Sequence, residues 1–223
     1  MDDRLFEAIN GLAGQSALLD AVMKAVASFG PYVLLGLVAL LWLMPRPTTP
    51  RPVERRLVVY AVATAALALA FNQVLGQLWD RPRPFVAHQV TLLISASHDS
   101  SFPSDHAALG FGLALPVLLR RRDWGFALLG GALVLGFARV YVGAHYPGDI
   151  AGSFLVATVA TSLVWSCRTY LEIPLEPLFG LLARLRLASS TDRVRPRQLL
   201  DGACPAQPTA TLPPRPNAVE GGR

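Results

Sequence analysis

Residues 57–79 read LVVYAVATAALALAFNQVLGQLW, a run of 23 residues without a charged side chain. Because about 20 apolar residues in a helix cross the hydrocarbon core of a bilayer, this run predicts a membrane-spanning helix. Residues 25–44 and 150–167 form two further uncharged runs of sufficient length. Two shorter runs, 107–119 and 124–138, reach spanning length only if polar residues at one end are included. We therefore predict an all-α fold, a polytopic membrane helix bundle of about five transmembrane helices.

The composition agrees with a membrane protein. Hydrophobic residues make up 52% of the chain and charged residues only 16%, whereas soluble domains carry about 25% charged residues. The net charge of +5 could indicate nucleic-acid binding, but 19 of the 20 basic residues are Arg and most lie in short clusters between the apolar runs. This distribution favours membrane topology over a continuous basic surface. We expect the lipid bilayer, and no nucleic acid, as a partner; the oligomeric state is left open.

The arginine clusters also predict the orientation of the bundle. They occupy residues 46–56 and 120–123, and further arginines follow the fifth apolar run. With five spans these regions fall on one side, which the positive-inside rule makes cytoplasmic. The segments 80–103 and 139–149 then meet on the extracytoplasmic side of the membrane.

The two ends of the chain differ from the spans. Residues 2–24 carry apolar side chains at helical spacing and predict an N-terminal interfacial amphipathic helix. Residues 171–187 mix apolar and charged side chains, and the sequence leaves open whether they insert into the membrane or lie on it. Residues 188–223 are rich in Pro, Thr and Arg, which predicts a disordered cytoplasmic tail. We therefore divide the chain into a membrane-embedded domain, residues 1–187, and a tail, residues 188–223.

The first polar motif is WDRPRPF, residues 79–85, which begins with the last residue of the run 57–79. Its prolines stiffen an extended backbone around Arg81 and Arg83. Planar guanidinium groups suit bidentate contacts with phosphate. Simple anchoring of the helix end at the membrane surface is the competing interpretation of this motif.

The second polar motif is SFPSDH, residues 101–106. Pro followed by Ser and Asp is typical of the start of a helix, whose free backbone N–H groups bind anions. Ser104 adds a hydroxyl donor, and His106 falls in the first helical turn. Ser104 and Asp105 could also do no more than cap the helix.

The third polar motif is RVYVGAHYPGD, residues 139–149. Pro147 suits the first position of a helix, so that His145 precedes the helix and Asp149 lies just inside it. A carboxylate at this spacing can orient an imidazole and leave its other nitrogen free to attack. An interfacial His with a capping Asp is the alternative, but Arg139 at the end of a span needs an anionic partner.

With these motifs in order, the sequence resembles the type 2 phosphatidic acid phosphatase superfamily, whose pattern is Lys-x6-Arg-Pro, Pro-Ser-Gly-His and Ser-Arg-x5-His-x3-Asp. The resemblance implies that His145 is a nucleophile forming a phosphohistidine, that Asp149 orients it, and that His106 protonates the leaving group and then activates water. It also implies phosphate contacts from Arg83, Arg139 and Ser104. No metal or other cofactor is expected.

Three positions depart from this pattern: Gly76 stands in place of the Lys, Asp105 in place of the Gly, and Ala138 in place of the Ser. Arg81 or Gln77 could replace the missing Lys as a phosphate contact. Asp105 adds a negative charge beside the site, which should disfavour an anion unless this carboxylate pairs with an Arg or raises the proton affinity of His106.

The same departures look similar to the bacitracin-resistance branch of the superfamily, the bacterial undecaprenyl pyrophosphate phosphatases. That resemblance implies hydrolysis of undecaprenyl pyrophosphate to the monophosphate in the bacterial cytoplasmic membrane, which recycles a carrier lipid for cell-wall synthesis. Phosphatidic acid or phosphatidylglycerophosphate hydrolysis and phosphoryl transfer to another lipid are alternatives that the motifs do not separate. A more distant alternative is an anion transporter whose Arg and His residues line a path.

Overall fold

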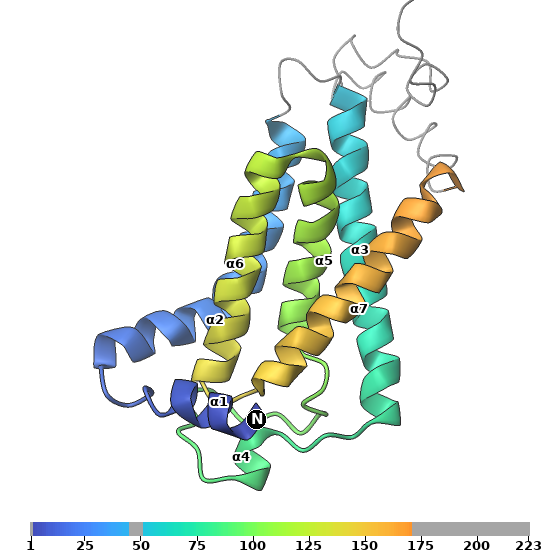
Figure 1. The fold of residues 1–223 in the computed structure, drawn as a ribbon. Coiled ribbons are helices and arrows are strands. Elements are labelled where there is room, and N and C mark those ends of the chain that lie inside the picture. Colours follow the sequence, from blue (N-terminus) through green and yellow to red (C-terminus); the bar gives the residue numbers. More distant parts are fainter. Residues whose placement is uncertain (1, 45–50, 171–223) are drawn as a thin grey trace, which may run out of the picture. The chain divides into compact units, whose positions relative to one another are not determined.

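The computed structural model describes residues 2–44 and 51–170, and within these ranges it contains seven helices and no strand (Figure 1). The predicted all-α fold is confirmed. The segment 171–187, the tail 188–223 and the predicted boundary between them lie outside the described residues. The helices are α1 (Asp2–Asn10), α2 (Ala17–Leu43), α3 (Arg51–Leu78), α4 (Pro84–Ala87), α5 (Asp105–Arg120), α6 (Arg122–Tyr141) and α7 (Pro147–Ser166).

Four of the described helices, α2, α3, α6 and α7, are long and apolar enough to cross a membrane. Helix α5, which corresponds to the short run 107–119, has only 16 residues. At 1.5 Å per residue it is about 24 Å long, less than the roughly 30 Å of a hydrocarbon core. It stands in the middle of the bundle, with α6 on one side and α3 and α7 on the other (Figure 1).

Helix α5 is central because small residues let its neighbours approach closely. Ala107, Ala108, Gly110 and Ala114 are buried along it, and an ideal Cβ on Gly112 would lie 2.7 Å from the Cα atom of Ala65 in α3. Small residues at such crossings are typical of packed membrane helices, where van der Waals contact replaces the hydrophobic effect.

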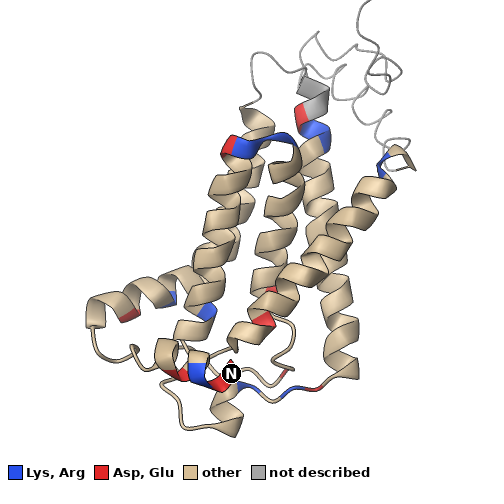
Figure 2. Ribbon diagram, in the orientation of Figure 1, with Lys and Arg blue, Asp and Glu red and all other residues tan. Residues whose placement is uncertain are grey.

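Charged residues gather at the two ends of the bundle, and the lengths between them are almost free of charge (Figure 2). The end that contains the α5–α6 junction carries arginines; there Arg121 is buried and its Nη1 atom lies 3.2 Å from Glu54 Oε2. The opposite end contains α1, α4 and the first turns of α5 and α7 (Figure 1). We call this the α1 end.

The prediction of a single amphipathic helix over residues 2–24 is wrong in one respect, because helix α1 ends at Asn10 and a second helix follows. Gly14 adopts a left-handed backbone with φ 84°, which glycine tolerates at little cost. The Oγ atom of Ser16 then accepts a hydrogen bond from the Leu19 N–H and caps a new helix. Helix α2 therefore starts at Ala17 and contains Pro31, and Figure 1 shows that this helix bends.

The close contact between α5 and α3 generates a stability prediction. Gly112→Ala places a methyl group against the α3 backbone, and overpacking of this kind costs about 1–3 kcal/mol. Thermal unfolding of the purified protein in detergent should show a lower Tm. The matched control is Gly130→Ala in α6, where a Cβ meets nothing within 4 Å and the Tm should not fall, since alanine favours helix. Equal Tm values for the two variants would contradict the packing described for α5.

Candidate active site

A cavity of about 400 Å³ lies at the α1 end of the bundle. It is bounded by the last turns of α3, by the segment between α4 and α5, and by the first turn of α5. The polar motifs found in the sequence contribute Arg83, His106, Arg139 and His145 to its wall. Three separate motifs of the chain thus place two guanidinium groups and two imidazoles around one space.

The imidazole of His145 is almost completely buried, with 2% of its surface exposed. Its Nδ1 atom lies 2.8 Å from the backbone carbonyl oxygen of Ser101. Because a carbonyl oxygen can only accept, Nδ1 carries the proton and donates it to this bond. The lone pair is then on Nε2, which lies 3.5 Å from Nη1 of Arg83 and 3.5 Å from Nη2 of Arg139. The unprotonated nitrogen of His145 therefore faces the cavity between two cations.

Asp149, in the first turn of α7, is completely buried beside this imidazole. Its Oδ2 atom accepts hydrogen bonds from the Ser101 hydroxyl at 2.6 Å and from the Tyr146 backbone N–H at 2.9 Å. The same oxygen is 3.7 Å from Nδ1 of His145, too far for a strong hydrogen bond. The carboxylate faces His145 as predicted, but the closer partner of Nδ1 is the Ser101 carbonyl.

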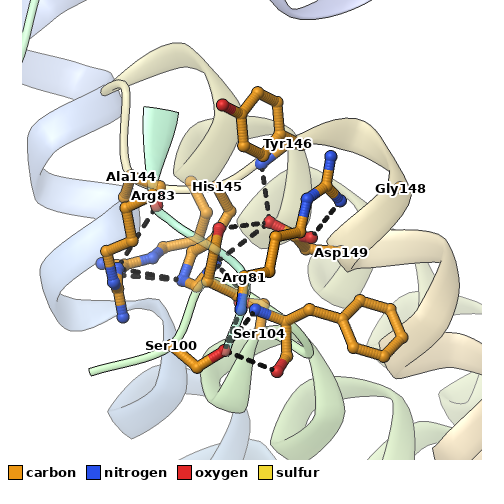
Figure 3. Close-up of polar contacts among 12 residues, drawn as sticks. Arg81, Arg83, Ser100, Ser104, Ala144, His145, Tyr146, Gly148 and Asp149 are labelled. Atoms are coloured by element: carbon orange, nitrogen blue, oxygen red, sulfur yellow. Dashed lines mark hydrogen bonds and ion pairs between the residues drawn. The ribbon is translucent and has the colours of Figure 1, made fainter. Parts of the chain in front are cut away.

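Arg83 and Arg139 differ in how many contacts they make. Arg83 donates to the Asp99 carbonyl from Nε at 3.1 Å, to Asp99 Oδ1 from Nη2 at 3.0 Å, and to the Ala144 carbonyl from Nη1 at 3.2 Å (Figure 3 shows the last). Arg139 is 7% exposed. Within the described chain, its Nε atom and the Oγ atom of Ser104 are buried without a hydrogen-bond partner. Buried donors of this kind normally have acceptors, so both fit an anion with several oxygens.

Two of the three departures from the superfamily pattern, Gly76 and Asp105, line the same cavity, whereas Ala138 is buried in an apolar cluster. The Asp105 carboxylate accepts hydrogen bonds from the side-chain amides of Asn72 at 2.9 Å and Gln73 at 3.4 Å. In the contacts described, the partners of Asp105 are these two neutral amides and not an arginine. Gly76 and Gln77 both line the cavity. A Cβ at Gly76 would lie 3.6 Å from the Ser100 Cβ atom, so the loop packs directly over this position.

Arg81, which the sequence offers as a replacement phosphate contact, is not among the residues that line the cavity. Its Nη1 atom lies 2.6 Å from Asp149 Oδ1 and its Nη2 atom 2.6 Å from Asp2 Oδ2 (Figure 3 shows the Asp149 contact). The guanidinium carbon also lies 4.1 Å from the centroid of the Tyr146 ring. Two carboxylates, rather than the cavity, determine where this side chain points.

The sequence reasoning missed several residues of the site. Ser101 is only the first residue of the motif 101–106, and Asp99 and Asn72 lie outside the three polar motifs. A backbone carbonyl acceptor such as that of Ser101 cannot be recognised from the sequence, because every residue has one. Asp99 and Asn72 lie close to recognised motifs, and their positions near the ends of spans are the only signal that the sequence offers.

Burial lowers the pKa of His145 below its ordinary value of 6.5, because the charged imidazolium is poorly solvated. The cations Arg139 and Arg83 lower it further, whereas Asp149 acts in the opposite direction. The pKa of Asp99 is lowered: burial opposes this, but the Ser97 hydroxyl and the Arg83 guanidinium favour the carboxylate. A neutral imidazole between two permanent cations is suited to attack an anionic electrophile.

A helix bundle with such a site is the arrangement expected of an integral membrane enzyme that acts on a phosphate. The model of the PAP2 superfamily matches residues 57–173. The chain belongs to the PAP2 superfamily, and it is a multi-pass membrane lipid phosphatase.

Similar proteins support the family and the fold. The chain is 34% identical over 159 residues to undecaprenyl-diphosphatase BcrC of Bacillus subtilis (strain 168), a match that covers 71% of this chain and 80% of that protein. The crystal structure of Aquifex aeolicus LpxE aligns with a TM-score of 0.60 and 24% identity over 74% of this chain and 94% of the other. A PAP2-type phosphatidylglycerolphosphate phosphatase from Bacillus subtilis aligns with a TM-score of 0.53 and 22% identity, over 75% and 86% of the two chains.

The buried contacts of Asp149 generate a second stability prediction. Asp149→Asn replaces one accepting oxygen with an NH2 group, although three donors point at this carboxylate. The unmatched donors should cost about 3 kcal/mol, measured as a lower Tm in detergent. Asp99→Asn is the control, because its side chain is 60% exposed and loss of an exposed pair costs about 1 kcal/mol or less. A Tm for Asp149→Asn no lower than that of the control would contradict the assigned hydrogen bonds.

Proposed function

We propose that the protein hydrolyses undecaprenyl pyrophosphate to undecaprenyl phosphate and inorganic phosphate through a phosphohistidine at His145. One observation carries the proposal: Nε2 of His145 faces the cavity between the guanidinium groups of Arg83 and Arg139. The choice of lipid is supported by the similarity to undecaprenyl-diphosphatase BcrC of Bacillus subtilis. Release of phosphate from other lipids, such as phosphatidic acid or phosphatidylglycerophosphate, is the alternative that an assay must separate.

The first half of the reaction forms the phosphohistidine. The Nε2 lone pair attacks the terminal phosphorus, and the bond from this phosphorus to the bridging oxygen breaks. Arg83, Arg139 and the Ser104 hydroxyl bind the non-bridging oxygens, where negative charge must be stabilised in the transition state. His106 donates a proton to the departing lipid phosphate. As His145 gains positive charge, the Ser101 carbonyl and the Asp149 carboxylate stabilise its Nδ1–H.

The second half returns the enzyme to its starting state. Water attacks the phosphorus of the phosphohistidine, and His106, now neutral, takes up one proton of this water. The bond from phosphorus to Nε2 breaks, inorganic phosphate forms, and His145 regains its lone pair. Both histidines therefore return to their initial protonation states after one turnover.

Charge distribution supports an extracytoplasmic site in a bacterial cytoplasmic membrane. The cavity is at the α1 end, whereas the arginines around the α5–α6 junction are at the other end (Figure 2). Clusters of arginine favour the cytoplasmic side. A pyrophosphate headgroup left on the outer surface by polymer assembly would then meet the cavity directly.

The proposed nucleophile is tested by measuring phosphate release from undecaprenyl pyrophosphate and phosphatidic acid with excess chelator. We expect chelator-resistant release that prefers the pyrophosphate. His145→Ala should lower it about a thousandfold or more while the protein remains folded. His98→Ala, which removes an exposed histidine, should leave it unchanged. An active and folded His145→Ala protein would disprove the phosphohistidine.

The lowered pKa of His145 generates a prediction of pH dependence. Burial, Arg139 and Arg83 hold the pKa of His145 below 6.5, so Nε2 keeps its lone pair when the pH falls to that value. Formation of the phosphohistidine should therefore lose half of its rate only below pH 6.5. Acid-quenched single turnovers at saturating radiolabelled substrate measure this rate directly. A half-loss at or above pH 6.5 would show that the two cations do not act on the nucleophile as described.

A further inference from the structure

Arg81 links two carboxylates on different helices. Its planar guanidinium contacts Asp149 of α7 and Asp2 of α1, each at 2.6 Å. Although burial alone would lower it, the two carboxylates raise the pKa of Arg81. The side chain is 23% exposed and therefore only partly screened by water. The proposed catalytic steps use neither Arg81 nor Asp2, so both residues need another explanation.

Asp2 makes a second contact with the helix that carries Asp149. Its Oδ1 atom accepts a hydrogen bond from the Gly148 backbone N–H at 2.8 Å. This N–H is one of the free donors in the first turn of α7, where a negative charge is favourable. A Cβ at Gly148 would lie 2.7 Å from Asp2 Oδ2. The glycine therefore leaves the space in which the Asp2 carboxylate approaches the start of α7.

Aromatic packing also contacts the guanidinium group of Arg81. The guanidinium of Arg81 stacks on the ring of Tyr146, and this ring packs on Phe6 of α1 with centroids 5.4 Å apart. Tyr146 follows His145 directly in the chain, and its backbone N–H donates to Asp149. Helix α1 thus contacts the nucleophile segment through a charge at one end and through an apolar ring in its middle.

We propose that Arg81 and Asp2 are positioning residues that hold Asp149, and through it His145, in the geometry of attack. The inference rests on the proposed function, because it assigns these residues to the same phosphohistidine step. Neither residue touches the cavity, so neither should contribute to substrate binding. Loss of Asp2 should therefore lower kcat and leave KM unchanged.

The role of Arg81 also predicts a change in the pH profile. The charged and titratable groups that face His145 are Arg83, Arg139 of α6, His106 of α5 and Asp149. Without Arg81, the negative charge of Asp149 is less neutralised and favours the imidazolium of His145. The acid limb of the pH profile, where the rate of phosphohistidine formation falls as the pH is lowered, should then move to higher pH in Arg81→Gln. Arg81→Lys retains the cation and should restore the wild-type position of this limb.

The decisive experiment compares Asp2→Ala with Asp3→Ala. Asp3 is the next residue of the same helical turn and lies 3.6 Å from exposed His88, away from the cavity. Both variants remove one carboxylate from the start of α1, so they affect the dipole of α1 alike. We expect a loss of about tenfold in phosphohistidine formation for Asp2→Ala, as for other small misplacements of reacting groups. Asp3→Ala should stay within about twofold of wild type.

The possible results separate this inference from the function on which it rests. A wild-type protein that forms no phosphohistidine overturns the proposed function and this inference with it. A wild-type protein that forms phosphohistidine, together with equal rates for Asp2→Ala and Asp3→Ala, overturns only the positioning role. If the pH at which phosphohistidine formation is lost in acid is the same in a folded Arg81→Gln protein as in the wild type, the positioning role alone is likewise overturned.

Discussion

The hydrogen bond from Nδ1 of His145 to the Ser101 carbonyl is the interaction on which the site depends. It fixes the tautomer, and with it the nitrogen that faces the two arginines. The bond requires that the segment before α5 stay in place. Ser101 is itself held, because its backbone N–H donates to the Arg81 carbonyl at 2.8 Å. Arg83 donates to the carbonyl and carboxylate of Asp99 in the same segment. The motif 79–85 thus holds the segment before α5 through the backbone carbonyl of Arg81 and through the side chain of Arg83.

The bundle contributes by keeping α5 short and central. Because α5 begins at Asp105, its first turn and the cavity lie within the end of the bundle, surrounded by α3, α6 and α7. Ser153 of α7 donates to the Ser104 carbonyl at 3.0 Å and fixes where this turn begins. A longer helix with the same sequence register would fill the space that the cavity occupies. The short length of the apolar run 107–119 therefore indicates where the cavity lies as well as which helix is central.

Much of this arrangement could be predicted from the sequence, because the lengths of apolar runs and the order of polar motifs are local properties. The cavity does bring Arg83, His106, Arg139 and His145 together. The direction of Arg81 could not be predicted, since it depends on Asp2, which lies 79 residues away. The break between α1 and α2 depends on the backbone of Gly14, and the hydrogen bond to Ser101 involves an atom that every residue possesses.

Position 76, where the superfamily pattern has a lysine, lies against the segment that holds His145. A Cβ on Gly76 would be in ordinary contact with the Ser100 Cβ atom at 3.6 Å and with the Phe102 carbonyl at 3.8 Å. In the contacts described, the Asp105 carboxylate accepts hydrogen bonds from the neutral amides of Asn72 and Gln73 and does not neutralise an arginine of the cavity by direct contact. Arg139 therefore keeps an unpaired Nε donor for an anion. The proposed binding of phosphate therefore rests on Arg139 and the Ser104 hydroxyl, whose buried donors are unmatched, and on Arg83, whose Nη2 atom is already paired with Asp99.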